Sequence, residues 1–170
     1  SDFDDFDFVE AYDDDPVSQD EQLLPDNRAP SAINCAFIGI GGGGGKLAKA
    51  FLDLGYTKTL LINTTVNDQP EGVPSEHFLL IPGADGVGKD ITLGKKVLSE
   101  SSASVEDALR TRIGKVDWLF VLAGGGGGTG SACGALHLSL ERYLKSTGGT
   151  GKVVYVITKP SSQELLNPTI

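Results

Sequence analysis

The sequence predicts a doubly wound α/β domain, built on a mostly parallel, Rossmann-like sheet with helices on both faces. Two observations lead to this prediction. From residue 33 onward, apolar runs of strand length alternate with longer segments of helical periodicity. The apolar runs are also continuous, rather than alternating with polar residues, as expected of parallel strands that are buried on both faces of a sheet.

The predicted elements follow one another in a regular order. Five apolar runs predict strands: residues 33–40 (INCAFIGI), 58–64 (KTLLINT), 77–81 (HFLLI), 116–123 (VDWLFVLA) and 152–158 (KVVYVIT). Three segments predict helices: residues 46–55, 104–114 and 130–149. Trp118 lies inside the fourth apolar run, so we expect it in the core.

Charge divides the chain into two parts. The net charge is −9, but residues 1–26 hold eleven of the 23 acids and no Lys or Arg, which leaves twelve acids against fourteen bases in the rest. We therefore predict an acidic N-terminal extension over residues 1–31 and a folded domain over residues 32–170. The extension alternates acids with aromatic residues, which is typical of a solvated tail or of a segment that docks on its own domain or on a neighbouring subunit.

The composition also excludes several classes of protein. No apolar run approaches the roughly 18 residues of a membrane span, and the acidic start lacks the pattern of a signal peptide. We predict a cytoplasmic protein with no membrane span and no nucleic-acid partner. Cys35 and Cys133 lie in apolar stretches and are expected to be buried thiols rather than a disulfide. His77 and His137 have no acids at metal-ligand spacing, which predicts no metal site formed by the protein alone.

Two runs of five glycines are the most informative feature of the sequence. Gly41–Gly45 and Gly124–Gly128 each follow a predicted strand and precede a segment of helical character. Such a loop presents backbone N–H groups at the positive end of a helix, and this arrangement binds anions, most often phosphate. Both runs lie at the carboxyl ends of strands, where parallel sheets bind their ligands. With the glycines of residues 86–89 as a third loop, the pattern suggests one ligand with a long phosphate chain, such as a nucleoside triphosphate.

Two other phosphate-binding patterns compete with this interpretation. Gly39, Gly41 and Gly44 satisfy the G-x-G-x-x-G pattern of dinucleotide-binding enzymes, but the second predicted strand ends in Asn63 and Thr64 instead of the acid that binds ribose. Residues 83–90 (GADGVGKD) nearly match a P-loop, but Asp90 replaces the hydroxyl residue that closes the motif. A dinucleotide-dependent oxidoreductase domain therefore stays a weaker alternative.

Five motifs together resemble the tubulin/FtsZ superfamily. GGGTGS (126–131) resembles its signature loop, and GIGGGGGK (39–46) is similar to the first nucleotide loop of FtsZ. INTT (62–65) resembles its second-strand motif, with Thr65 in place of an acid. GVGKDITLGK (86–95) is similar to the loop around the γ-phosphate, and ITKPSSQE (157–164) to the fifth-strand loop. The resemblance covers residues 35–164 in the family's order, and it implies the strand order 3-2-1-4-5.

The resemblance implies GTP or GDP as the ligand, with Mg²⁺, and it assigns roles to residues of each motif. The glycines of the first run and Lys46 would hold the inner phosphates, residues 86–89 the γ-phosphate, and Glu164 the ribose. The nucleotide-binding residues implied in this way are Gly41, Gly42, Gly43, Gly44, Gly45, Lys46, Asn63, Thr64, Gly86, Val87, Gly88, Lys89, Gly126, Gly127, Gly128, Thr129, Gly130, Ser131 and Glu164.

The function implied by the resemblance is that of a GTP-binding domain in a filament-forming cytoskeletal protein. Subunits of this family assemble head to tail, and GTP is hydrolysed on assembly, when a loop of one subunit reaches the nucleotide of the next. That loop lies beyond Ile170 by this resemblance, so the catalytic residues are unknown and little hydrolysis is expected from these 170 residues alone. The alternative is a non-hydrolysing structural or assembly protein that retains the nucleotide-binding fold.

Overall fold

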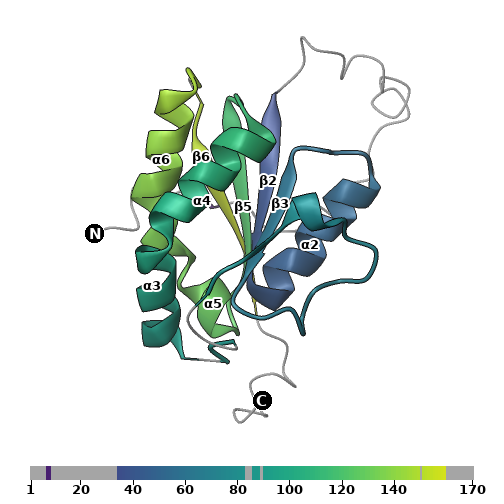
Figure 1. Cartoon of the computed structure of the whole chain (residues 1–170), viewed down its shortest axis with the longest axis vertical. Coiled ribbons are helices and arrows are strands. Elements are labelled where there is room, and N and C mark those ends of the chain that lie inside the picture. Colours follow the sequence, from purple (N-terminus) through teal and green to yellow (C-terminus); the bar gives the residue numbers. More distant parts are fainter. Residues whose placement is uncertain (1–6, 9–33, 83–85, 89, 150, 160–170) are drawn as a thin grey trace.

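A six-stranded parallel sheet forms the centre of the molecule (Figure 1). The computed structural model describes residues 7–8, 34–82, 86–88, 90–149 and 151–159 of the 170-residue chain. The strand order is β1-β6-β5-β2-β3-β4, and every neighbouring pair is parallel. The strands are β1 (Asp7–Phe8), β2 (Cys35–Ile40), β3 (Thr59–Asn63), β4 (Phe78–Leu80), β5 (Trp118–Gly124) and β6 (Val153–Thr158).

The five predicted strands are confirmed, and so is their order, because 3-2-1-4-5 in the predicted numbering corresponds to β4-β3-β2-β5-β6. The sequence did not predict β1. This short strand comes from the acidic N-terminal extension and pairs with the outer edge of β6, with Asp7 opposite Val154 and Phe8 opposite Tyr155.

Helices cover both faces of the sheet, as predicted. On one face lies α2 (Gly41–Asp53), and on the other lie α3 (Ile91–Glu100), α4 (Ser102–Ala108) and α6 (His137–Ser146) (Figure 1). Shorter turns complete the described helical elements: α5 (Gly128–Ser131), the 3₁₀ turns η2 (Ser75–His77) and η4 (Cys133–Leu136), and the π turn η3 (Leu109–Ile113). The predicted helix at residues 130–149 is thus divided among the end of α5, η4 and α6.

The start of α2 differs from the prediction, because the first glycine run is the first turn of the helix and not a loop before it. Glycine is a poor helix former, so packing against the sheet has to favour it here. A Cβ atom at Gly44 would overlap the carbonyl oxygen of Leu122 on β5. Only glycine therefore lets the helix lie this close to the strand.

Another difference is α3, whose first half, residues 91–95, was predicted to belong to a phosphate loop. Its N-cap is Asp90, whose carboxylate accepts a hydrogen bond from the backbone N–H of Leu93 at 3.0 Å. Asp90 interrupted the P-loop pattern in the sequence. The structure gives this residue an ordinary role, because a short acidic side chain is among the best N-caps.

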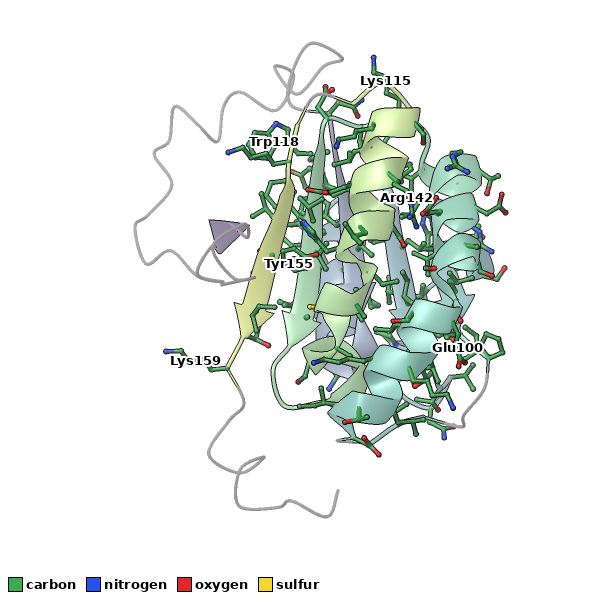
Figure 2. All side chains as sticks on the ribbon, turned by 90° about the vertical axis from the view of Figure 1, so that its left-hand side faces the viewer. Glu100, Lys115, Trp118, Arg142, Tyr155 and Lys159 are labelled. Atoms are coloured by element: carbon green, nitrogen blue, oxygen red, sulfur yellow. The ribbon has the colours of Figure 1, made fainter. Side chains whose placement is uncertain are left out.

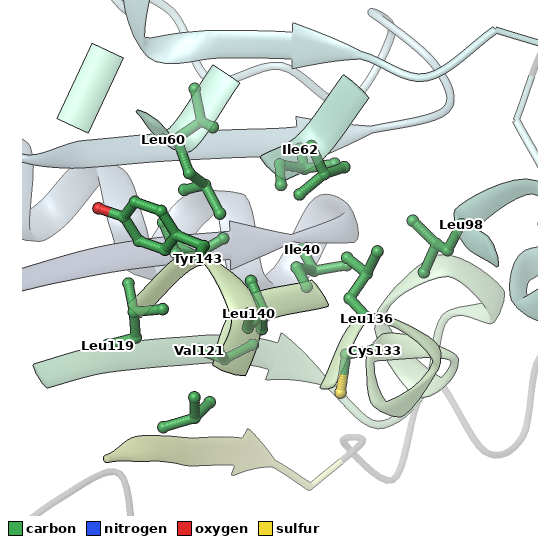
Figure 3. Packing of buried hydrophobic residues seen from close by; sticks show 14 of the residues in the cluster. Ile40, Leu60, Ile62, Leu98, Leu119, Val121, Cys133, Leu136, Leu140 and Tyr143 are labelled. Carbon is green, nitrogen blue, oxygen red and sulfur yellow. The ribbon is translucent and has the colours of Figure 1, made fainter. Parts of the chain in front are cut away.

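Two apolar clusters, one on each face, hold the layers together. The larger lies between the sheet and α3, α4 and α6, and includes Ile40, Leu60, Val121, Leu140 and Tyr143 (Figure 3). The smaller lies beneath α2 and is built around Phe37, which stacks on Phe51 of the helix with ring centroids 4.0 Å apart. Trp118, which we expected in the core, is only partly buried on the α2 face.

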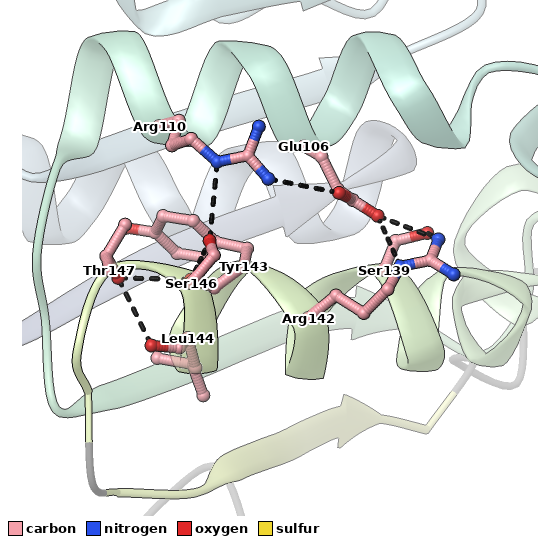
Figure 4. A network of polar contacts seen from close by, with 8 residues as sticks. All are labelled: Glu106, Arg110, Ser139, Arg142, Tyr143, Leu144, Ser146 and Thr147. Atoms are coloured by element: carbon pink, nitrogen blue, oxygen red, sulfur yellow. Dashed lines mark hydrogen bonds and ion pairs between the residues drawn. The ribbon is translucent and has the colours of Figure 1, made fainter.

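Polar contacts join α4 to α6 on the outer side of the larger cluster (Figure 4). Glu106 of α4 forms ion pairs with Arg110 in the following π turn and with Arg142 of α6, at 3.3 and 2.8 Å. Beneath them, the hydroxyl of Tyr143 donates to the backbone carbonyl of Gly114. Burial raises the pKa of Tyr143 to about 12.

The two cysteines are free thiols. Cys133 is buried and Cys35 partly so, and burial raises the pKa of both, that of Cys133 to about 11. None of the helices in the described part of the chain has the length and apolar character that a membrane crossing requires.

Candidate functional site

The strand register brings four chain segments together at one end of the sheet. Ile40, the last residue of β2, lies opposite Ile62 of β3 and Ala123 of β5, and Gly124 lies opposite Thr158 at the end of β6. These four strands therefore end at nearly the same level. Because all of them are parallel, the segments that follow them meet at the carboxyl edge of the sheet, which is where such sheets bind ligands.

The two glycine runs touch each other at this edge. A Cβ atom at Gly43 would lie 3.3 Å from the Cα atom of Gly124, and one at Gly41 would lie 3.0 Å from the backbone nitrogen of Gly130. Gly41 also has a φ of 77°, a conformation that side chains other than glycine rarely adopt. The two runs thus form one continuous backbone surface, which larger residues would break up.

A cleft of about 1100 Å³ opens above this surface. This volume is at the upper end of the range for small-molecule sites and suits a nucleotide. Its lining comes from the first turn of α2, the loop after β3, residues 86–88, the second glycine run and the end of β6: Ile40, Gly41, Gly42, Gly43, Lys46, Asn63, Thr64, Thr65, Asn67, Asp68, Gln69, Pro70, Glu71, Gly86, Val87, Gly88, Gly124, Gly125, Gly126, Gly127, Gly128, Thr129, Gly130, Thr158 and Lys159.

Buried polar side chains form the floor of the cleft. The hydroxyl of Thr64, at the end of β3, lies 3.2 Å from the hydroxyl of Thr129, which follows the second glycine run. The side-chain oxygen of Asn63 accepts a hydrogen bond from the backbone N–H of Thr64 at 2.8 Å. All three residues are at most 5 % exposed. Buried hydroxyls that satisfy each other fix the separation of the two segments that carry them.

Residues 86–88 are held against both of these segments. The backbone N–H of Gly86 donates to the carbonyl of Thr64 at 3.1 Å, and that of Gly128 donates to the carbonyl of Gly88 at 2.7 Å. Ser131 supports the second glycine run from behind, because its hydroxyl donates to the carbonyl of Gly125 at 2.8 Å. The three predicted phosphate loops therefore form one connected unit.

The electrostatics of the cleft favour an anion on the glycine side. The backbone N–H groups in the first turn of an α-helix lack intrahelical acceptors and carry partial positive charge. In α2 this turn consists of glycines, so no side chain covers these groups. Lys46 and Lys159 are exposed at the cleft and add two positive charges.

Two carboxylates also line the cleft, and the sequence did not predict them as site residues. Asp68 and Glu71 lie in the loop after β3, and Asp68 faces the first glycine run: a Cβ atom at Gly42 would lie 3.3 Å from the Cβ atom of Asp68. Their position in an irregular loop, outside every recognisable motif, gave no signal in the sequence.

Most of the predicted binding residues come together in the cleft. Among the described ones, Gly44, Gly45 and Ser131 do not line it. Gly44 and Gly45 face β5 and Leu61 of β3 instead, and Ser131 supports the glycine run as described above. Lys89 and Glu164 lie outside the described residues. The binding roles of all these residues stay predictions.

Sequence comparison finds relatives among curated proteins. No protein-family model matches the chain. Among curated proteins, the chain is similar to cell division protein FtsZ 1 of Pyrococcus furiosus, with 23% identity over 167 residues that cover 87% of this chain and 42% of that protein.

Solved structures with the same fold agree with the sequence relative. CetZ from Methanosaeta thermophila superposes with a TM-score of 0.67 at 24% identity, over 77% of this chain and 38% of that one. CetZ2 from Haloferax volcanii, solved as a GTPγS-bound protofilament, superposes with a TM-score of 0.61 at 25% identity, over 80% of this chain and 44% of that one. The chain thus spans about two fifths of the length of these relatives.

Proposed function

Sequence and fold both point to the tubulin/FtsZ superfamily, and on that premise we propose that this chain is the GTP-binding domain of a filament-forming protein. One observation carries the proposal: two glycine runs from different parts of the chain meet at the carboxyl edge of the sheet and join the first turn of α2 in one cleft. A backbone surface of this length fits a chain of phosphates better than a single anion.

The residues of the cleft fit a nucleoside triphosphate with Mg²⁺. The phosphates would lie on Gly41–Gly43 and on the second glycine run, with Lys46 as a neutralising cation. Among the described residues no group of three His, Cys, Asp or Glu side chains could hold a metal ion alone. Mg²⁺ in nucleotide sites needs only one or two carboxylates besides the phosphates, and Asp68 faces the glycine side of the cleft. The metal would neutralise phosphate charge there.

Filament formation and GTP turnover are the further steps of the proposal. One of the similar solved structures is described as a GTPγS-bound protofilament, and by analogy we propose that copies of the whole protein assemble head to tail. Hydrolysis would then require the neighbouring subunit. A non-hydrolysing assembly protein with the same cleft is the alternative, and the two differ in whether phosphate release rises with protein concentration.

Calorimetric titration of GTP, GDP, ATP and NAD in the presence of Mg²⁺ tests the ligand. We expect guanine nucleotides to bind and NAD not to bind. The Gly127→Trp variant should lose binding, because Gly127 lines the cleft and a Cβ atom added to it would meet no other residue within 4 Å. The new ring would therefore fill the cleft without disturbing the packing.

The matched control is Gly134→Trp, since Gly134 is also exposed with open space around it but lies in η4, away from the cleft lining. It should bind GTP like the unmodified chain. Unchanged GTP affinity in Gly127→Trp, with circular dichroism equal to that of the control, would remove the site from the cleft described here.

A further inference from the structure

On the α2 face of the sheet, several apolar side chains of β5 and β6 stay partly exposed beside the described helix. α2 packs against β2, β3 and β5, and its first turn approaches Leu122 and Gly124 of β5. Beyond it, Trp118 and Phe120 of β5 and Val156 of β6 are partly buried. The rings of Trp118 and Phe120 stack with centroids 6.4 Å apart, and Phe120 stacks on Phe37 at 5.4 Å. Figure 2 shows Trp118 on the opposite side of β6 from α6. We call Trp118, Phe120 and Val156 the aromatic half-face.

The topology indicates which segment crosses this half-face. The chain runs from β1, at the edge, to β2, with β6 and β5 between them, and all four strands are parallel. Such crossovers are right-handed in nearly all proteins. The step from β1 to β2 has the same direction across the sheet as the step from β2 to β3, which α2 makes. A right-handed crossover from β1 to β2 therefore lies on the α2 face.

The length of the connection suffices for this path. Residues 9–33 provide 25 residues, whereas a parallel crossover needs about a dozen. A right-handed connection of this kind would pass over β6 and β5, the strands that carry the half-face. The segment also contains apolar side chains that could cover aromatic rings, among them Tyr12, Leu23 and Leu24.

Charge supports the same path. Residues 9–33 hold seven acids and one Arg. Lys58, Lys115 and Lys152 lie just before β3, β5 and β6, at the amino edge of the sheet where the segment must end. Asn34, the first described residue after the segment, donates its side-chain N–H to the carbonyl of Lys115 at 2.9 Å and accepts from the ammonium of Lys58 at 2.9 Å. The ammonium of Lys58 therefore lies beside the start of β2.

We propose that residues 9–33 of the same chain cover the aromatic half-face, with their apolar side chains on Trp118 and Phe120 and their acids toward the lysines at the amino edge. This docking is independent of the proposed nucleotide function. It also assigns the acidic segment to its own domain instead of a neighbouring subunit.

Trp118 reports on this surface directly, because it is the only tryptophan of the chain. The test is acrylamide quenching of its fluorescence in the full chain and in the double variant Leu23→Ser/Leu24→Ser. We expect the quenching constant to rise about twofold or more in the variant, with a red-shifted emission, because the ring loses its apolar cover. The control is Leu54→Ser/Leu138→Ser, which changes two leucines that are 72% and 69% exposed elsewhere and should leave the quenching unchanged.

The dependence of Trp118 quenching on protein concentration and on salt shows whether residues 9–33 or a second copy of the chain cover the aromatic half-face. Cover by the same chain predicts a quenching constant that is independent of protein concentration and that rises between about 0.05 and 0.5 M NaCl, where ions screen the lysines. Protection that disappears on dilution would assign the half-face to a second copy and overturn the proposal. Quenching in the unmodified chain as strong as that of free tryptophan amide would overturn it too.

Discussion

Thr64 and Thr129 join the two halves of the cleft floor through hydroxyl oxygens that lie 3.2 Å apart in a fully packed environment. One residue follows β3 and the other comes after β5, so this pair connects segments that are 65 residues apart in the sequence. The pair holds the glycine run that precedes Thr129 at a fixed distance from the loop that follows Thr64.

Removing both of these hydroxyls should destabilise the fold by less than the sum of the two single removals. Thr129→Val leaves the Thr64 hydroxyl buried without this partner, which costs about 1–3 kcal/mol, whereas Thr64→Val/Thr129→Val replaces both groups by isosteric apolar ones and should cost less than the sum. Urea unfolding followed by Trp118 fluorescence measures all four members of the cycle. Strictly additive losses would mean that the two hydroxyls do not interact.

Alkaline pH should destabilise the protein through Tyr143. The unfolded chain releases this proton near pH 10, but burial raises the folded pKa to about 12. Between these values the unfolded state binds fewer protons, so stability falls with rising pH, by up to about 1.4 kcal/mol per pH unit. Below pH 10 Tyr143 is protonated in the folded and the unfolded state, so the free energy of unfolding no longer depends on its titration.

Urea midpoints at pH 9, 10 and 11 measure this slope. Tyr143→Phe should reduce it, although the variant loses some stability at neutral pH with the hydrogen bond to Gly114. Burial also raises the pKa of Tyr155, so Tyr143→Phe/Tyr155→Phe should flatten the curve further. A slope that is the same in the single variant and in the unmodified chain would contradict this account.

The ion pairs of Glu106 should stabilise the packing of α4 against α6. The Glu106 side chain is 14% exposed and contacts two arginines, while Asp53 is 57% exposed and pairs only with Lys49 in the same helix among the contacts described. Glu106→Gln should therefore cost about 1–3 kcal/mol and Asp53→Asn less than about 0.5 kcal/mol. Thermal unfolding of both variants at low salt makes the comparison, and equal losses would mean that Glu106 acts as an ordinary surface residue.

Sequence reasoning found the strands because each is a continuous apolar run, and the resemblance gave their order. It misjudged elements whose formation depends on distant residues. The first turn of α2 consists of poor helix formers, and only the close approach of Gly44 to Leu122 explains why it is helical. β1 was missed because two residues in an acidic segment, Asp7 and Phe8, form a strand only by pairing with the edge of β6.

In the cleft, too, residues with a local sequence signal were predicted, and residues placed there only by the tertiary fold were missed. The glycine runs were recognisable from their unusual composition, and the structure brings them together. Asp68 and Glu71 belong to a loop without periodicity or motif, and their presence at the cleft follows only from where β3 ends. Thr64 was predicted as a binding residue, yet its hydrogen bond to Thr129 depends on a strand pairing that no local pattern specifies.

The pairing of β1 with β6 has a consequence for synthesis on the ribosome. Residues 7 and 8 are made long before their partners, Val154 and Tyr155. At about 5–20 residues per second, the N-terminal strand waits several seconds or longer for the edge on which it docks. During that time the strands β2 to β5 can pair, but the outer edge of β6 has to be completed by a segment that was made long before it. Closing the sheet is therefore a late event, and a nascent chain stalled before residue 153 should be the form most prone to aggregate through unpaired strands.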